Sequence, residues 1–82
     1  MSRQEIMTRL AAVLEQVAGV DPAEVTEQRT LADDLDLDSL TMVEVIVTVE
    51  DSFHVKVAED VAQDFRTVGD LASYLEVSHA HA

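Results

Sequence analysis

The stretch that decides the fold runs from residue 33 to residue 53 and reads DDLDLDSLTMVEVIVTVEDSF. Its second part carries one apolar stripe, which consists of Met42, Val45, Ile46, Val49 and Phe53. At 3.6 residues per turn these side chains fall within an arc of about 100°, the width of a helical stripe that faces a core. Asp38 or Ser39 can cap the start. We therefore predict a helix over residues 39–53.

The opposite side of this predicted helix mixes apolar side chains with carboxylates. Leu40, Glu44, Val47 and Asp51 cluster there within about 60°, and Val43 and Glu50 flank them. A helix that only covers a core normally presents a solvated outer side. We therefore interpret this side as a docking surface. The docking face, as we name it, consists of Leu40, Val43, Glu44, Val47, Glu50 and Asp51.

The first part of the stretch, residues 34–38, alternates aspartate and leucine with the period of a strand. The only partner run is residues 55–57, which is short. An extended loop with leucines inward and aspartates outward is therefore favoured, and a strand is the alternative. This loop ends a connection that is longer than ordinary loops and must be pinned by apolar side chains. The candidates are Val25, Leu31, Leu35 and Leu37.

Upstream of this connection, residues 2–18 have the spacing of a helix, with Ser2 as N-cap and Gly19 as a stop. The buried stripe is predicted to be Ile6, Leu10, Val13, Leu14 and Val17. Residues 20–24 include an Asp-Pro pair that is typical of a turn which winds briefly into helix.

Downstream, a short helix is predicted over residues 59–64, with Val61 and Phe65 on one side. A last helix begins with Thr67 as cap and buries Val68, Leu71, Ala72 and Leu75. Residues 78–82 are expected to fray into a flexible tail. The sequence thus predicts an all-α fold in one domain, residues 1–82, with three longer helices, one short helix and a long loop between the first two long helices.

Composition limits the function of these 82 residues. The chain has seventeen acids against five Lys and Arg, a net charge of −12, so nucleic acid is disfavoured and basic partner surfaces are favoured. Residues 33–64 hold ten acids and a single base, Lys56, a local charge of −9 that opposes compaction. There is no cysteine, so a reactive sulfur would have to come from a cofactor. No signal peptide and no run of about 18 apolar residues occurs, which predicts a cytoplasmic protein without a membrane span.

An isolated Asp-Ser-Leu is well explained by helix capping. The wider string, Asp33-Asp34-Leu35-Asp36-Leu37-Asp38-Ser39-Leu40 followed by Met42-Val43-Glu44, resembles the attachment site of acyl carrier proteins. Arg66-Thr67-Val68-Gly69-Asp70 resembles the family's lead into its last helix. These strings look most like those of carriers in actinobacterial type II fatty acid synthesis, although Thr41 takes the place of a serine.

The resemblance implies a four-helix acyl-carrier-like bundle and a carrier without catalytic residues. Ser39 would take 4'-phosphopantetheine from coenzyme A, with Asp38 and Leu40 beside it, and acyl chains would ride on the arm as thioesters. Partners would meet the docking face together with Val57, Glu59 and Asp60.

The implied partners are a phosphopantetheinyl transferase, malonyl transferase, ketoacyl synthase, and the reductases and dehydratase of fatty acid synthesis, and the carrier is expected to be a monomer. Thr41 and Ala58 replace an acid and a proline found in many relatives, so partner preference and the entry to the short helix can differ here.

Several alternatives stay open. An enzyme is disfavoured because Ser39 lacks a Gly-x-Ser-x-Gly context. The histidines are also poorly placed to act as its base, since His54 is near the end of a predicted helix and His79 and His81 are in the predicted tail. Asp34, Asp36 and Asp38 mimic an EF-hand, but Ser39 and Val45 stand where its Gly and Glu would be, so no specific metal site is predicted. A discrete polyketide carrier, or an acidic interaction or cation-binding module without an arm, would share the docking face.

Overall fold

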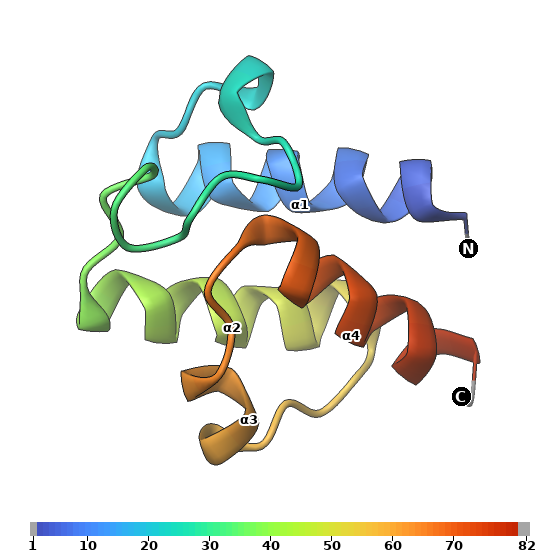
Figure 1. The fold of residues 1–82 in the computed structure, drawn as a ribbon. Helices are drawn as coiled ribbons and strands as arrows, with labels where there is room; N and C mark the ends of the chain where they lie inside the picture. The colour runs from blue at the N-terminus through green and yellow to red at the C-terminus, as the bar shows by residue number, and fades with distance from the viewer. Residues whose placement is uncertain (1, 81–82) are drawn as a thin grey trace.

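The computed structural model describes residues 2–80, and its elements are helices. They are α1 (Arg3–Ala18), the short 3-10 helix η1 (Pro22–Glu24), α2 (Ser39–Phe53), α3 (Glu59–Gln63) and α4 (Val68–Ala80). α1 packs against both α2 and α4, and η1 lies against α1. α3 lies beyond α2, on the side away from α1 (Figure 1). The predicted all-α architecture of three longer helices and one short helix is confirmed.

The ends of α1 follow the sequence signals. The side chain of Ser2 accepts a hydrogen bond from the N–H of Glu5 at 3.2 Å, as an N-cap does. Gly19 takes the left-handed conformation with φ 70°, and its N–H donates to the carbonyl of Glu15 at 2.9 Å. Only glycine adopts this conformation without a Cβ penalty, so both predicted ends of the helix are confirmed.

The core consists of apolar side chains, and the described residues include no buried polar or charged side chain. Most members of the predicted stripes are buried, whereas Val17 and Met42 are half-buried at the edge of the core. The buried residues are Ile6, Leu10, Val13, Leu14, Val20, Val25, Leu31, Leu35, Leu37, Val45, Ile46, Val49, Phe53, Val57, Val68, Leu71, Ala72 and Leu75.

The long loop between η1 and α2 is pinned as the sequence indicates. Its four predicted apolar anchors are all buried, and the aspartates between them are exposed. Residues 34–38 form no strand, so that alternative is wrong. Within residues 2–80 the only sheet-like contact is an isolated antiparallel bridge between Thr30 and Thr67. The N–H of Leu31 donates to the carbonyl of Arg66 at 2.8 Å there, which joins the loop to the start of α4.

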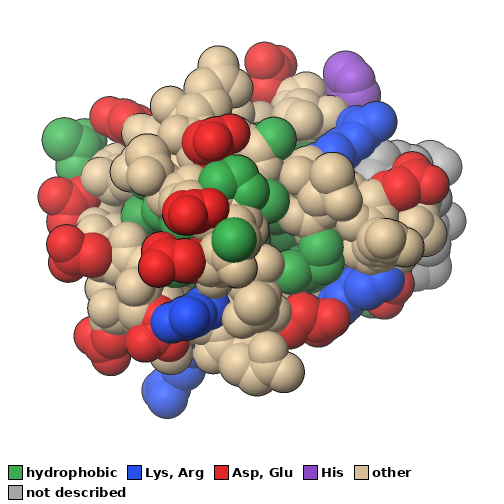
Figure 2. Space-filling view, turned by 90° about the horizontal axis from the view of Figure 1, so that it is seen from above, with side chains coloured by type: hydrophobic (Ala, Val, Ile, Leu, Met, Phe, Trp, Pro, Cys, Tyr) green, Lys and Arg blue, Asp and Glu red, His purple; other side chains and the backbone are tan. Residues whose placement is uncertain are grey.

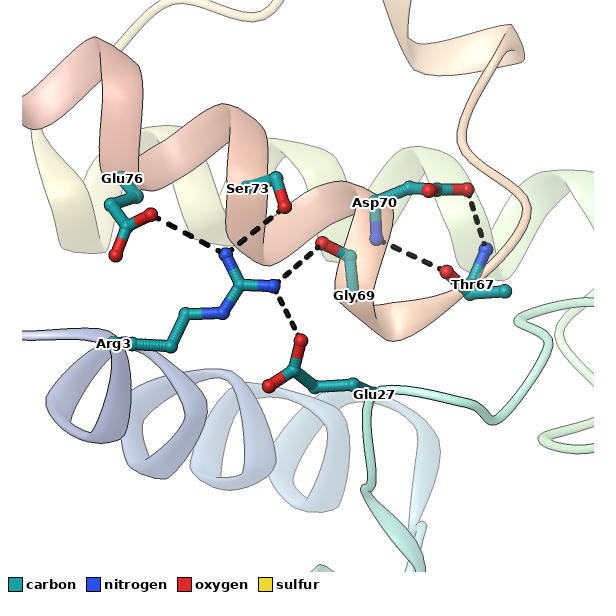
Figure 3. Close-up of polar contacts among 7 residues, drawn as sticks. All are labelled: Arg3, Glu27, Thr67, Gly69, Asp70, Ser73 and Glu76. Carbon is teal, nitrogen blue, oxygen red and sulfur yellow. Dashed lines mark hydrogen bonds and ion pairs between the residues drawn. The ribbon is translucent and has the colours of Figure 1, made fainter.

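A polar junction closes the bundle where α1 begins. The guanidinium of Arg3 donates hydrogen bonds to Glu27, to Ser73 Oγ at 3.0 Å and to the carbonyl oxygen of Gly69 at 3.3 Å. It also forms an ion pair with Glu76 at 3.6 Å. The Arg3 junction, as we name these five residues, thus ties α1 to the long loop and to α4 (Figure 3).

The start of α4 is capped as predicted. Thr67 Oγ1 accepts from the N–H of Asp70 at 3.1 Å, and Asp70 Oδ2 accepts from the N–H groups of Arg66 and Thr67 at 3.0 and 3.1 Å. The two bonds between Thr67 and Asp70 are reciprocal and make a capping box, which Figure 3 also shows. The bonds that its carboxylate accepts hold the pKa of Asp70 below its ordinary value, because the backbone N–H groups of Arg66 and then Thr67 stabilise the carboxylate.

Two helix ends differ from the sequence-based bounds. α3 ends at Gln63, one residue early, with Asp64 as its C-cap. α4 continues to Ala80, although fraying was predicted from Ser78. No glycine or proline follows Leu75 to stop the helix. The tail pair His79 and His81 lies outside the residues whose side chains are described. Among the described helices, none has both the length and the hydropathy that a bilayer crossing needs.

Candidate functional site

Ser39 occupies the first helical position of α2 and is exposed. The preceding residue, Asp38, is the N-cap, and its Oδ1 accepts from the N–H of Thr41 at 2.8 Å. This decides between the two caps that the sequence allowed. Since Asp38 caps the helix, Ser39 Oγ is not needed as a cap. Ser39 Oγ makes no hydrogen bond to another residue in the part of the chain that the structure describes. The serine hydroxyl is therefore accessible to a modifying enzyme.

The carboxylate beside the serine is kept ionised. The hydrogen bonds from Thr41, that of its backbone N–H first, lower the pKa of Asp38 from its ordinary value. An anion attached to Ser39 would add to this charge, and the positive end of the helix dipole, at the same place, offsets part of the repulsion.

A folded loop holds the serine in place. Thr30 and Asp34 exchange two hydrogen bonds of 2.9 Å, from the N–H of Thr30 to Asp34 Oδ2 and from the N–H of Asp34 to Thr30 Oγ1. The N–H of Leu37 donates to the carbonyl of Leu31 at 3.1 Å. Asp36 has φ 56°, a left-handed conformation that aspartate tolerates better than most residues. The chain thus enters α2 from a fixed direction.

The docking face lies on the outer side of α2 as predicted. Its apolar members are strongly exposed for their type, Leu40 at 70%, Val43 at 59% and Val47 at 56%. Glu44 and Asp51 are also exposed, and in α3 so are Glu59 and Asp60. At the far end of α2 the surface is hollowed, and the hollow is lined by Val47, Thr48, Glu50, Asp51, His54, Val55 and Lys56. The surface therefore offers apolar contacts framed by acids.

Two predicted docking residues are placed differently. Val57 is only 8% exposed and belongs to the core, so its side chain adds little to the surface beside α2, and its contact with a partner stays a prediction. Its neighbours in sequence, Lys56 and Ala58, point outward instead. Glu50 is half-buried, and its Oε2 accepts from the N–H of Val57 at 2.8 Å. Glu50 therefore has an internal contact that the spacing of acids on α2 did not reveal.

Acids are not confined to the docking face. Figure 2 looks onto the molecule from the side of η1 and α1, and acidic side chains are spread over that face as well. A groove there is lined by Gln4, Met7, Thr8, Ala11, Ala12, Glu15, Pro22 and Val25. Among the described residues, no group of three or more His, Cys, Asp or Glu side chains is arranged to hold a metal ion. The EF-hand-like aspartates have other roles, since Asp34 bonds to Thr30 and Asp38 caps α2.

These features define a class of small all-α domains, in which an exposed serine opens a helix whose outer side mixes apolar and acidic side chains. Comparison with known proteins agrees. The family described as "Phosphopantetheine attachment site" matches residues 8–75. The chain is 45% identical to the meromycolate extension acyl carrier protein of Mycolicibacterium aurum, over 92% of this chain and 77% of that protein. It is 41% identical to the acyl carrier protein of Acidothermus cellulolyticus, over 92% of this chain and 89% of that protein.

A solved structure shows the same fold. The acyl carrier protein of Enterococcus faecalis superposes with a TM-score of 0.78 and 27% sequence identity, and the match covers 95% of this chain and 99% of that one. The chain belongs to the acyl carrier protein family, whose members are carriers and not catalysts. The resemblance drawn from the Asp-Ser-Leu string is thereby confirmed.

Proposed function

We propose that this protein carries acyl groups as thioesters on a 4'-phosphopantetheine arm attached to Ser39 Oγ. The observation that carries the proposal is the position of Ser39, which is exposed at the start of a fifteen-residue helix and is relieved of capping by Asp38. The match to phosphopantetheine attachment sites supports the same cofactor. The arm would supply the thiol that a chain without cysteine lacks.

The group of this chain that reacts during attachment is the exposed hydroxyl of Ser39. A separate phosphopantetheinyl transferase with bound magnesium would direct Ser39 Oγ to the phosphorus of coenzyme A that bears the pantetheine. A P–O bond to Ser39 forms, the P–O bond to the adenosine bisphosphate leaving group breaks, and the serine proton passes to a base of the transferase. Leu40, exposed next to the serine, is then available for contact with the enzyme that performs the transfer.

The first experiment is intact-mass measurement after incubation with a phosphopantetheinyl transferase, magnesium and coenzyme A. We expect the wild type to gain the mass of one phosphopantetheinyl group and Ser39→Ala to gain none. Ser52→Ala removes another hydroxyl of α2 and serves as a matched control that should still be loaded. An unmodified wild type, or a loaded Ser39→Ala, would remove the proposal and favour an interaction module without an arm.

We also infer that the partners are enzymes of fatty acid synthesis, among them malonyl transferase, ketoacyl synthase, the reductases and the dehydratase. Relatives named for meromycolate extension support fatty acyl chain extension over polyketide synthesis. The exposed apolar residues and acids of the docking face suit partners with basic surfaces, and such association weakens with salt.

Charge reversal at Glu44 or Asp51 tests this surface, because both side chains are exposed and their loss costs little folding stability. We expect slower loading and slower malonyl transfer, with a melting temperature close to that of the wild type. Unchanged turnover by both enzymes would show that the partners bind elsewhere. Transfer by polyketide enzymes alone would reassign the pathway. A single cytoplasmic domain that is monomeric remains a prediction, which cell fractionation and light scattering can check.

A further inference from the structure

One peptide group between α2 and α4 is held at both of its polar atoms. The carbonyl oxygen of Lys56 accepts a hydrogen bond from Tyr74 Oη at 2.8 Å. The N–H of Val57, which belongs to the same peptide group, donates to Glu50 Oε2, also at 2.8 Å. The two side chains come from different helices, Glu50 from α2 and Tyr74 from α4. We name this arrangement the peptide clamp.

The helix that follows the clamp has few anchors of its own. α3 is five residues long, buries none of its residues, and starts after Ala58, which provides no side-chain cap. Its position is set by the residues on either side. Val57 is buried before it, and after it the ring of Phe65 meets the ring of Tyr74 edge to face, with centroids 5.5 Å apart. Tyr74 therefore contacts the chain both before and after α3.

Electrostatic repulsion acts against this position. Residues 33–64 carry a net charge of −9, and Glu59 and Asp60 of α3 add their charge to that of the acids on α2. Like charges on two neighbouring helices favour separation. The peptide clamp opposes this separation, because its two bonds fix the chain just before α3, one to α2 and one to α4.

We propose that Glu50 and Tyr74 are positioning residues, which fix α3 relative to α2 so that Glu59 and Asp60 join the docking face in one surface for partner enzymes. The effect on partner enzymes rests on the proposed function, whereas the hydrogen bonds of the peptide clamp do not. Glu50 acts through an acceptor oxygen that faces the protein and not through a charge that faces the partner.

Amide hydrogen exchange measured by NMR tests the geometry. Glu50→Ala removes the acceptor and should raise the exchange rate of the Val57 N–H roughly tenfold, as expected for the loss of one hydrogen bond. Glu50→Gln keeps an acceptor oxygen in the same place and should change that rate less than about threefold. Glu44→Ala removes the same side chain from an exposed position on α2 and serves as the control, with no change expected at Val57. Tyr74→Phe keeps the ring contact with Phe65 and should raise the exchange rates of the α3 amides.

Kinetics with the phosphopantetheinyl transferase test the consequence. Glu50→Ala and Tyr74→Phe should raise KM roughly three- to tenfold with little change in kcat, because they displace part of the binding surface and leave Ser39 in place. Glu50→Gln should restore most of the wild-type KM. At Glu44, where the charge itself faces outward, Gln should be as damaging as Ala.

The two substitutions at Glu50 therefore decide the matter. Equal damage from Gln and Ala, in Val57 exchange and in KM, would overturn the proposal and make Glu50 an ordinary docking charge. Unchanged α3 exchange in Tyr74→Phe would overturn the role of Tyr74. Intact mass after complete loading tests the proposed function separately. If the arm never attaches to the wild type, the proposed function fails, but the amide exchange rates still test the geometry of the peptide clamp.

Discussion

Replacing Arg3 by glutamine should loosen the end of the bundle where α1 begins. The guanidinium bonds to Glu27 of the long loop and to Ser73, Gly69 and Glu76 of α4 (Figure 3). Glutamine is shorter and neutral, so it can keep at most one of these contacts. The substitution also makes the net charge −13, because one of the five Lys and Arg is lost from a chain that carries −12.

The magnitude follows from the exposure of the partners. The side chains of Glu27 and Glu76 are 47% and 48% exposed, so each ion pair is a surface pair worth about 0.2–1 kcal/mol. The bonds to Ser73 Oγ and to the Gly69 carbonyl contribute roughly 0.5–1.5 kcal/mol each. With one contact retained by glutamine, we expect a loss of about 1.5–2 kcal/mol in the free energy of unfolding. At about 6 °C per kcal/mol for a domain of this size, Tm falls by roughly 10 °C.

The assay is thermal unfolding followed by circular dichroism, with Arg29→Gln as the control. Arg29 is exposed and has no side-chain bond or ion pair within residues 2–80, and its loss changes the net charge equally. We expect Arg29→Gln to change stability by less than about 0.5 kcal/mol. Arg3→Lys keeps the charge without the planar fork and should lie between wild type and Arg3→Gln. Equal losses in Arg3→Gln and Arg29→Gln would refute this reasoning, because net charge alone would then explain the effect.

Three further predictions concern the cap, the left-handed residue and the acidic charge. Asp70→Ala removes half of the capping box and should cost about 1 kcal/mol at neutral pH. The pKa of Asp70 is lowered in the folded protein, so its carboxylate contributes fully to stability above the ordinary aspartate pKa of about 4, and this contribution is lost as the pH falls through the folded pKa. The Tm values of wild type and variant should therefore converge in acid. Tm curves that stay parallel would contradict this. His54 caps the end of α2 with φ 56°, where a side chain costs about 1–2 kcal/mol and glycine costs about 0.5–1 kcal/mol in entropy. His54→Gly should therefore raise the free energy of unfolding, measured in urea, by about 0.5–1 kcal/mol. A decrease would show that the imidazole makes a contact that stabilises the fold by more than the backbone strain costs. Millimolar magnesium should raise Tm more than sodium at matched ionic strength, because residues 33–64 carry a charge of −9 and repel one another. Identical melting curves would show that magnesium does not reduce this repulsion beyond ordinary screening.

The helices were predictable because local signals agreed with one another. Apolar spacing identified α1, α2 and α4, and the caps Ser2 and Thr67 and the stop at Gly19 were read from residue type. The alternation of residues 34–38 was compatible with a strand or with an extended loop. The lack of an equally long partner run correctly favoured the loop. Ser39 became the candidate attachment site because the residues around it resemble those of a known family, since a serine at a helix start has an ordinary explanation by itself.

Contacts between residues far apart in sequence could not be predicted in the same way. The Arg3 junction joins Arg3 to residues that lie 24 to 73 positions away, and no period in the sequence encodes which arginine reaches which acid. Val57 was assigned to a partner-contacting segment by resemblance, whereas its burial depends on how the chain leaves α2. The one signal that could have revealed the peptide clamp is Tyr74, because a tyrosine at the edge of a buried stripe usually finds a partner for its hydroxyl.

The division of labour between Asp38 and Ser39 has a consequence for repeated use of the carrier. The first turn of α2 is capped by the residue before the serine, so an arm joined to the Ser39 hydroxyl, as proposed above, would leave the capping hydrogen bond in place while acyl groups are exchanged on the thiol of the arm. Each exchange of acyl groups would then leave the hydrogen bonds at the start of α2 unchanged.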